Sequence, residues 1–263
     1  MFRSSIRKFR SHTAVRTFST ESYENVDAMS IDKAVDMSSP ALVSYLHQYG
    51  RNEHPAVTQL RKTSIAALPI SKARNILEPT TNAMVTWFAR AFKATRTIEI
   101  GTFTGITSLS LAFAVKENAL ASNLPLHTFT HTTDSTLTRP ITNSFPNVTV
   151  DDLCTNLEAP LALTLDSVLH TVTDIAKPAW EEAGVLGNPL VFLHGQGEDV
   201  IRVLADSPLA GTFDMVFVDA NKQGYYNYYE AAMVLLRKGG MVCLDNVLWR
   251  GSVANLDSMV VDL

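Results

Sequence analysis

The chain has 263 residues, of which 46% are hydrophobic and 18% charged, a balance typical of one globular domain with a full core. The formal net charge is −4 and the body of the chain carries no basic cluster, so the charge pattern does not indicate nucleic-acid binding. No apolar run reaches the roughly 18 residues of a membrane span. The two cysteines, Cys154 and Cys243, make neither a disulfide framework nor a zinc site, which favours a reducing compartment.

The first twenty residues are rich in arginine, serine and threonine and contain no acidic side chain. Phe2, Ile6 and Phe9 fall on one face of a helix, and basic residues occupy another face. This composition is typical of a mitochondrial transit peptide, so we expect residues 1–20 to direct the chain to mitochondria. A disordered basic tail is the alternative. Residues 21–53 are expected to form an accessory segment with a helix over 41–49.

From residue 54 onward, helical and strand patterns alternate along the chain. This alternation predicts an α/β fold with a doubly wound, mostly parallel sheet. The expected helices are 56–67, 80–92, one from 106, one that includes 175–180, 200–204 and 228–237; the expected strands are 96–100, 161–166, 190–193, 213–218 and 241–244.

The segment 118–160 interrupts the alternation. Threonine, serine, asparagine and proline make up nearly half of it, and it contains no glycine. Such a composition does not supply enough apolar side chains for a core layer. We therefore expect an inserted loop between the first helix of the sheet region and the next strand.

Two neighbouring strands are expected to end on acidic residues. Asp219 follows the apolar run 213–218, and the pair Asp245-Asn246 follows 241–244, after Gly239-Gly240 has ended the intervening helix. In a parallel sheet the carboxyl ends of neighbouring strands meet at one rim, where ligands bind. One acid at a strand end often caps a helix or faces water, but two such ends beside an asparagine favour a site for a hard cation such as Mg²⁺.

Lys222 lies in the loop that follows the first of these acids. Lysines in such loops are commonly surface residues, but a nearby dication lowers a lysine pKa and makes the neutral amine available as a base. Trp249 follows the second acid and is either a core residue or one wall of a slot for an aromatic substrate.

The loop from Glu99 to Gly105 joins a strand to a helix and suits close approach of a ligand to the backbone. Its glycines have the spacing G-x-x-x-G, whereas a dinucleotide fingerprint has G-x-G-x-x-G, so an NAD-dependent oxidoreductase is disfavoured. A ribose-binding acid should end the next strand. Asp166 and Asp134 both qualify, and we favour Asp166 because a helix with core spacing follows it.

Taken together, these motifs resemble the cation-dependent O-methyltransferases of the caffeoyl-CoA and catechol type, which use S-adenosylmethionine (SAM). The resemblance covers about residues 54–253 except the insert. Its most specific segments are TIEIGTFTG (97–105), IAKPAWEEAG (175–184), FDMVFVDANK (213–222) and GGMVCLDNVLWRGSV (239–253). It implies a Rossmann-like class I methyltransferase fold, and a homodimer because members of the family are often dimers.

The resemblance also implies a reaction and a set of site residues. The reaction is methyl transfer from SAM to a hydroxyl of a catechol-type or caffeoyl-type aromatic acceptor, with Mg²⁺ or another divalent cation and a lysine base. The implied SAM-binding residues are Glu99, Gly101, Thr107, Asp166, Gly195, Gln196, Gly197 and Asp219; the metal ligands are Asp219, Asp245 and Asn246; the catalytic residue is Lys222; and the acceptor contacts are Tyr225 and Trp249.

Three features depart from the family pattern. The insert 118–160 is not typical of the family, and Asn75 stands where a methionine is usual near the transferred methyl group. The chain stops at Leu263, whereas the family continues into a helix and a strand that complete the sheet edge, so we expect that edge to be missing. These departures leave one alternative function, a catalytically impaired family member that acts as a cofactor-binding or interaction module.

Overall fold

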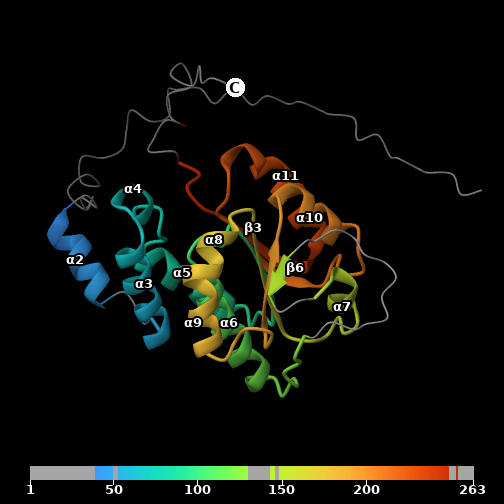
Figure 1. The fold of residues 1–263 in the computed structure, drawn as a ribbon. Coiled ribbons are helices and arrows are strands. Elements are labelled where there is room, and N and C mark those ends of the chain that lie inside the picture. Colours follow the sequence, from blue (N-terminus) through green and yellow to red (C-terminus); the bar gives the residue numbers. More distant parts are fainter. Residues whose placement is uncertain (1–38, 50–52, 130–142, 146–147, 249–252, 254–263) are drawn as a thin grey trace, which may run out of the picture. The chain divides into compact units, whose positions relative to one another are not determined.

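The computed structural model describes residues 39–49, 53–129, 143–145, 148–248 and 253 (Figure 1). The chain divides into two units, residues 1–44 and 45–263, and the second unit contains the whole of the central sheet. Helix α2 (Pro40–Tyr49) matches the helix expected over 41–49. The expected transit peptide, residues 1–20, lies outside the described residues and stays a prediction. No helix within the described ranges has both the length and the apolar character that crossing a bilayer requires.

A six-stranded sheet forms the centre of the second unit, in the order β2-β4-β3-β1-β5-β6. Five strands are parallel, and β2 pairs antiparallel with β4 at one edge. The predicted doubly wound, mostly parallel sheet is therefore confirmed. The strands are β1 (Arg96–Ile100), β2 (Asn143–Phe145), β3 (Leu161–Asp166), β4 (Leu190–His194), β5 (Phe213–Val218) and β6 (Leu236–Leu244).

Helices cover both faces of the sheet, as crossover connections between parallel strands require. Side chains of α7, α10 and α11 pack on one face, and those of α3, α5, α6 and α9 pack on the other. The helices are α3 (Pro55–Ala67), α4 (Ile70–Ala73), α5 (Pro79–Ala91), α6 (Ile106–Ala121), α7 (Val150–Cys154), α8 (Leu169–Thr171), a π-helical turn (Val172–Ala176), α9 (Lys177–Glu182), α10 (Gly197–Ala205), a 3₁₀ turn (Lys222–Gly224) and α11 (Tyr225–Leu235).

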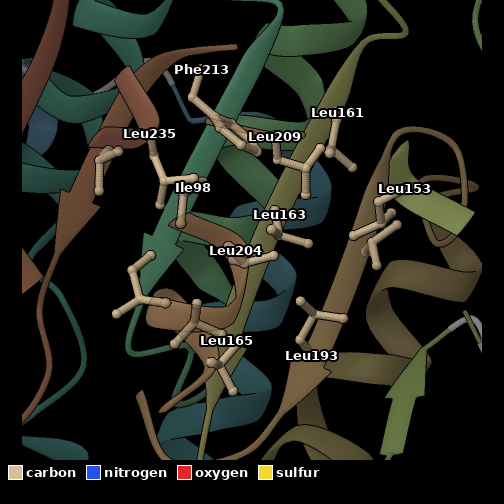
Figure 2. Close-up of a cluster of buried hydrophobic side chains, with 14 of the residues drawn as sticks. Ile98, Leu153, Leu161, Leu163, Leu165, Leu193, Leu204, Leu209, Phe213 and Leu235 are labelled. Atoms are coloured by element: carbon tan, nitrogen blue, oxygen red, sulfur yellow. The ribbon is translucent and has the colours of Figure 1, made fainter. Parts of the chain in front are cut away.

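Strands β3, β4 and β5 are mostly apolar because both of their faces are buried. In β3, Leu163 and Leu165 belong to the hydrophobic cluster on the α10 and α11 side, whereas Ala162 belongs to the cluster on the other face. Figure 2 shows the first cluster, in which Leu204 of α10 and Leu235 of α11 pack with the leucines of the sheet. This alternation fixes the register of each strand, since a slip of one residue would exchange the two faces.

The segment 118–160 contributes more to the fold than its composition predicts. Strand β2 extends the sheet, and α7 begins with a capping box between Thr149 and Asp152. Phe129 is only 1% exposed, and Leu153 is fully buried in the cluster of Figure 2. The expectation of a loop without a core layer was therefore wrong for these parts, because a few well-spaced apolar residues are enough to dock a polar segment.

The boundary between α11 and β6 also differs from the expectation. Helix α11 ends at Leu235 rather than Arg237, and β6 begins at Leu236. Gly239 and Gly240 do not end the helix; they lie in β6, where the pairing with β5 shifts register between Phe213 and Met215. The positive φ of Gly239, 82°, is the conformation that such a bulge favours.

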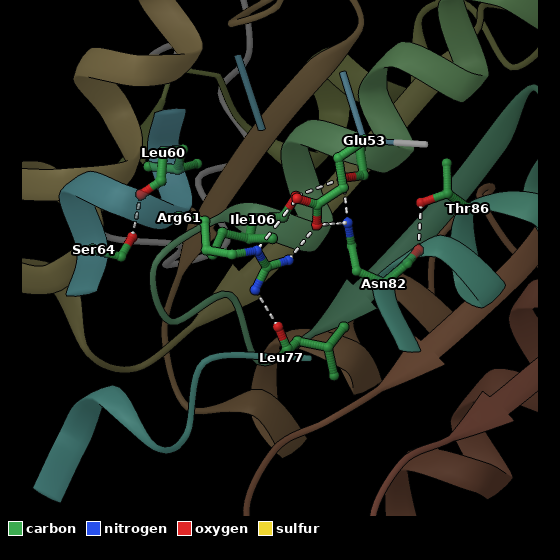
Figure 3. Close-up of polar contacts among 9 residues, drawn as sticks. Glu53, Leu60, Arg61, Ser64, Leu77, Asn82, Thr86 and Ile106 are labelled. Atoms are coloured by element: carbon green, nitrogen blue, oxygen red, sulfur yellow. Dashed lines mark hydrogen bonds and ion pairs between the residues drawn. The ribbon is translucent and has the colours of Figure 1, made fainter. Parts of the chain in front are cut away.

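A buried ion pair joins the middle of α3 to the segment that precedes the helix (Figure 3). The Arg61 guanidinium lies 2.5 Å from a Glu53 carboxylate oxygen, and the two side chains are 9% and 2% exposed. Arg61 also donates to the backbone oxygen of Leu77, and Asn82 donates to Glu53 and to Ser110. These contacts tie α3, α5 and α6 together beneath the loop that enters α5.

Replacing Arg61 with leucine should destabilise the fold by about 3–5 kcal/mol, because Glu53 would keep a buried charge without its partner. Urea denaturation of the Arg61→Leu variant measures this loss. The matched control is Arg90→Leu, which breaks the exposed pair with Glu117 and should cost about 1 kcal/mol or less. Equal losses in the two variants would contradict the structural importance of the buried pair.

Strand β1 places one acidic side chain, Glu99, inside the protein. Its carboxylate accepts hydrogen bonds from the hydroxyls of Ser108 and Thr164, the latter at 2.7 Å. Burial raises the pKa of Glu99 to about 8, and the two hydroxyl hydrogen bonds only partly oppose this shift. Glu99 therefore holds a proton in the native state at a pH where the unfolded chain has lost it.

The stability of the protein should consequently fall as the pH rises from about 5 to about 8, by up to about 1 kcal/mol per pH unit. The contribution is complete below the pKa of the unfolded chain and is lost by the native pKa of about 8. The Glu99→Gln variant mimics the protonated acid, so its free energy of unfolding should not show this decrease between about pH 5 and about pH 8. Urea denaturation at three pH values tests it, and parallel profiles of the two proteins would show that native Glu99 is already ionised.

Candidate active site

The carboxyl ends of the parallel strands are held in register by backbone hydrogen bonds that continue one residue beyond each strand. The ladder therefore extends into the loops, and the first loop residues lie side by side along one rim of the sheet. These bonds run from Gly195 to Asp166 at 3.0 Å, and from Gly101 to Leu165, Asp219 to Ile100 and Asp245 to Val218 at 2.9 Å each.

Gly101 allows the loop after β1 to pass directly against the loop after β5. A Cβ atom at Gly101 would lie 2.0 Å from the backbone oxygen of Asp219, so no side chain fits. Its φ of +100° is also a conformation that favours glycine. The glycine predicted at this position is thus required by the packing of the strand ends, whatever ligand the loop binds.

A cavity of about 1120 Å³ opens at this rim, near the upper end of the range usual for ligand pockets. It is bounded by the loop after β1, the start of α6, the ends of β5 and β6, and the segment between α4 and α5. Seven of the predicted site residues line it: Glu99, Gly101, Thr107, Asp219, Lys222, Asp245 and Asn246.

Lys222 lies among the predicted metal ligands. Its Nζ is 3.3 Å from Oδ1 of Asp219 and 3.0 Å from Oδ1 of Asn246. Burial raises the pKa of Asp219, the neighbouring charge of Asp245 raises it further, and Lys222 opposes both effects. These oxygens therefore lie where a positive charge is favourable.

The donor set fits a hard cation in its chemistry. Asp219 and Asp245 supply carboxylate oxygens, and Asn246 supplies an amide oxygen. No group of three or more His, Cys, Asp or Glu side chains suited to a metal occurs in the described part of the chain, so the available donors here are two carboxylates and one amide. Asn246 has φ 55°, a left-handed conformation that asparagine tolerates, and its backbone N–H donates to Asp245.

Asp166 does not line the cavity in the described structure but supports the loop that does. Its carboxylate accepts the backbone N–H groups of Thr102 and Phe103 at 2.9 and 2.8 Å, and that of Val168 at 2.8 Å. The other candidate, Asp134, lies outside the described residues. The position of Asp166 at the end of β3 agrees with the prediction, while its role toward a ribose stays a prediction.

The remaining predicted residues that the structure describes do not line the cavity. Gly195, Gln196 and Gly197 form the turn from β4 into α10, where a side chain at Gly197 would meet the hydroxyl of Tyr228. Tyr225 directs its hydroxyl toward the ends of β5 and β6, within 3.3 Å of the backbone oxygen of Val218. Trp249 lies outside the described residues.

The segment between α4 and α5 lines the cavity although sequence reasoning singled out only Asn75 within it. The additional residues come from this segment, from the start of α5 and from the end of β6, and they are Arg74, Ile76, Leu77, Glu78, Thr81, Val247 and Leu248. The available signal was Pro79, which opens α5 and fixes where the preceding residues, Arg74 to Glu78, meet the rim.

The chain is similar in sequence to known O-methyltransferases. The family model described as "O-methyltransferase" matches residues 161–262. Caffeoyl-CoA O-methyltransferase of Petroselinum crispum is 44% identical over 82 residues, which are 31% of this chain and 34% of that protein. Catechol O-methyltransferase domain-containing protein 1 of Mus musculus is 27% identical over 212 residues, which are 81% of this chain and 63% of that protein. The chain thus spans less than two thirds of these relatives.

Solved structures share the fold. The O-methyltransferase TomG from Streptomyces achromogenes, solved in complex with SAM, has a TM-score of 0.58 and 25% identity, and the match covers 82% of this chain and 76% of TomG. An O-methyltransferase from Bacillus cereus has a TM-score of 0.59 at 21% identity, which shows the fold alone. Over residues 161–262 and in its overall architecture, the chain is thus similar to O-methyltransferases.

Proposed function

We propose that the chain transfers a methyl group from SAM to a hydroxyl of a catechol-type or caffeoyl-type aromatic acceptor with the help of a divalent metal ion. The observation that carries this proposal is the position of Lys222 beside Asp219 and Asn246 on the rim of the cavity. A base and a set of hard oxygen donors are thereby next to a glycine loop of the kind that approaches ligands closely. The SAM bound to TomG and the names of the relatives support the choice of cofactor and acceptor.

The loop after β1 and the start of α6 are suited to the amino-acid end of SAM. Glu99, Gly101 and Thr107 line the cavity there, and the free N–H groups at the start of α6 favour a carboxylate. Asp166 holds this loop through the backbone N–H groups of Thr102 and Phe103, and it also accepts the N–H of Val168 beyond β3. A carboxylate has about four acceptor positions, so one remains for a ribose hydroxyl. When bound, SAM supplies a methyl group on a positively charged sulfur.

Asp219, Asp245 and Asn246 would hold the metal ion, and Mg²⁺ fits their oxygen donors. The chemistry that such an ion would supply is a lower pKa of the acceptor hydroxyl. Lys222 then accepts the hydroxyl proton while the oxygen forms a bond to the methyl carbon and the carbon–sulfur bond breaks. The fixed rim contributes by keeping base, acceptor and methyl donor in one arrangement.

Methyl transfer should depend on the divalent metal. With labelled SAM and caffeic acid as acceptor, a chelator should abolish transfer, and added Mg²⁺ should restore it. Asp245→Ala should lower transfer by about 100-fold or more, because it removes a charged ligand. The matched control is Glu230→Gln, an exposed acid on α11 that should leave transfer unchanged. Transfer that is indifferent to chelator would exclude the metal role.

Asp166→Asn should weaken SAM binding about tenfold or more. The substitution places an amide N–H₂ group where the carboxylate now accepts N–H donors from the loop, so it removes both a loop contact and the proposed ribose contact. Calorimetric titration with SAM measures the dissociation constant, and Asp174→Asn, an exposed acid, is the control. An unchanged constant would contradict the role of Asp166. SAM binding by the unaltered chain without any turnover would favour the alternative, a cofactor-binding module.

A further inference from the structure

The hydroxyl of Tyr225 lies between the two strand ends that carry the proposed metal ligands. Tyr225 is the first residue of α11, and its hydroxyl is 3.0 Å from the backbone oxygen of Asp245 and 3.3 Å from that of Val218. Lys222 donates a hydrogen bond to the same hydroxyl. The phenol therefore connects the lysine to the backbone of β5 and β6.

The direction of these hydrogen bonds is fixed by the chemistry of the groups. A phenol has one O–H proton, and the shorter of its two contacts with backbone oxygens directs that proton to Asp245. The hydroxyl thus donates to the backbone oxygen of Asp245. Its lone pairs then remain to accept an N–H of Lys222.

Tyr225 differs from the other partners of the Lys222 amine. Within the described residues, the side-chain hydrogen bonds of Nζ go to Asp219, Asn246 and Tyr225. The first two supply oxygens that the proposed function assigns to the metal ion. The tyrosine oxygen is not one of those ligands, so it continues to hold the lysine when a cation engages Asp219 and Asn246.

We propose that Tyr225 is a positioning residue that holds Lys222 against the rim, rather than a contact of the acceptor. This role rests on the proposed function of Lys222 as the base. Lys222 lines the cavity, whereas Tyr225 is not among the described residues that do so. One N–H of the amine is held by the phenol, which leaves the rest of the amine directed to the cavity.

The Tyr225→Phe variant tests this role because it keeps the ring and removes only the oxygen. We expect kcat to fall about 10- to 100-fold, the range for a lost hydrogen bond to a charged group, while the KM for the acceptor stays within about twofold. The control is Tyr226→Phe, whose tyrosine is 72% exposed and should be neutral. A raised KM at unchanged kcat would overturn the proposal and support the acceptor contact instead.

A double-mutant cycle separates positioning from general structural support. If Tyr225 acts through Lys222, Tyr225→Phe should have no further effect on the residual activity of Lys222→Met. If Tyr225→Phe lowered the activity of the unaltered protein and that of Lys222→Met by the same factor, the proposal would be overturned. Thermal melting of each variant confirms that the proteins compared are folded.

A measurement that needs no turnover keeps this inference distinct from the proposed function. Nitrogen-selective NMR detects lysine ammonium groups when hydrogen bonds slow their exchange with water, and Lys222→Met assigns the signal. We expect the Lys222 signal in the metal-free unaltered protein, and its loss in metal-free Tyr225→Phe. A signal that survives in Tyr225→Phe would overturn the positioning role. Absence of methyl transfer beside the expected NMR result would instead contradict the proposed function alone.

Discussion

The hydrogen-bond ladder that continues beyond the parallel strands is the interaction on which the candidate site depends. Because each loop begins in register with its neighbour, residues far apart in sequence, such as Gly101, Asp219 and Asp245, start from adjacent positions on one rim. The fit is close enough that Gly101 has no space for a side chain against Asp219. The acidic residues, Lys222 and the glycine loop therefore line one cavity because the backbone hydrogen bonds hold the strand ends side by side.

Much of this arrangement could be predicted from sequence because the central strands are buried on both faces. Strands β1, β3 and β5 have the predicted bounds, since their apolar runs end abruptly at glycine or acidic residues. The same ends predicted the gathering of Asp219, Asp245 and Asn246 with Lys222. Strand β6 was harder to delimit, because Gly239 and Gly240 normally indicate a helix end, whereas here they form a bulge.

The features that sequence did not predict depend on contacts between distant segments. Docking of β2 and α7 depends on single apolar residues such as Leu153. The average composition of about forty residues does not reveal such single positions. The hydroxyl of Tyr225 was assigned to the acceptor by resemblance, because nothing in the sequence shows that it reaches the backbone of Asp245. The segment before Pro79 reaches the cavity only through the path of α4 and α5.

The contacts of Lys222 have a consequence for how a metal ion would enter. The ammonium group already satisfies an oxygen of Asp219 and one of Asn246, so it acts as an internal counter-ion. A dication arriving at the rim must displace this resident charge from both oxygens, in addition to losing part of its own water shell. A dication that bound between these oxygens would therefore exchange with the lysine charge, while the contact of the amine with Tyr225 would remain.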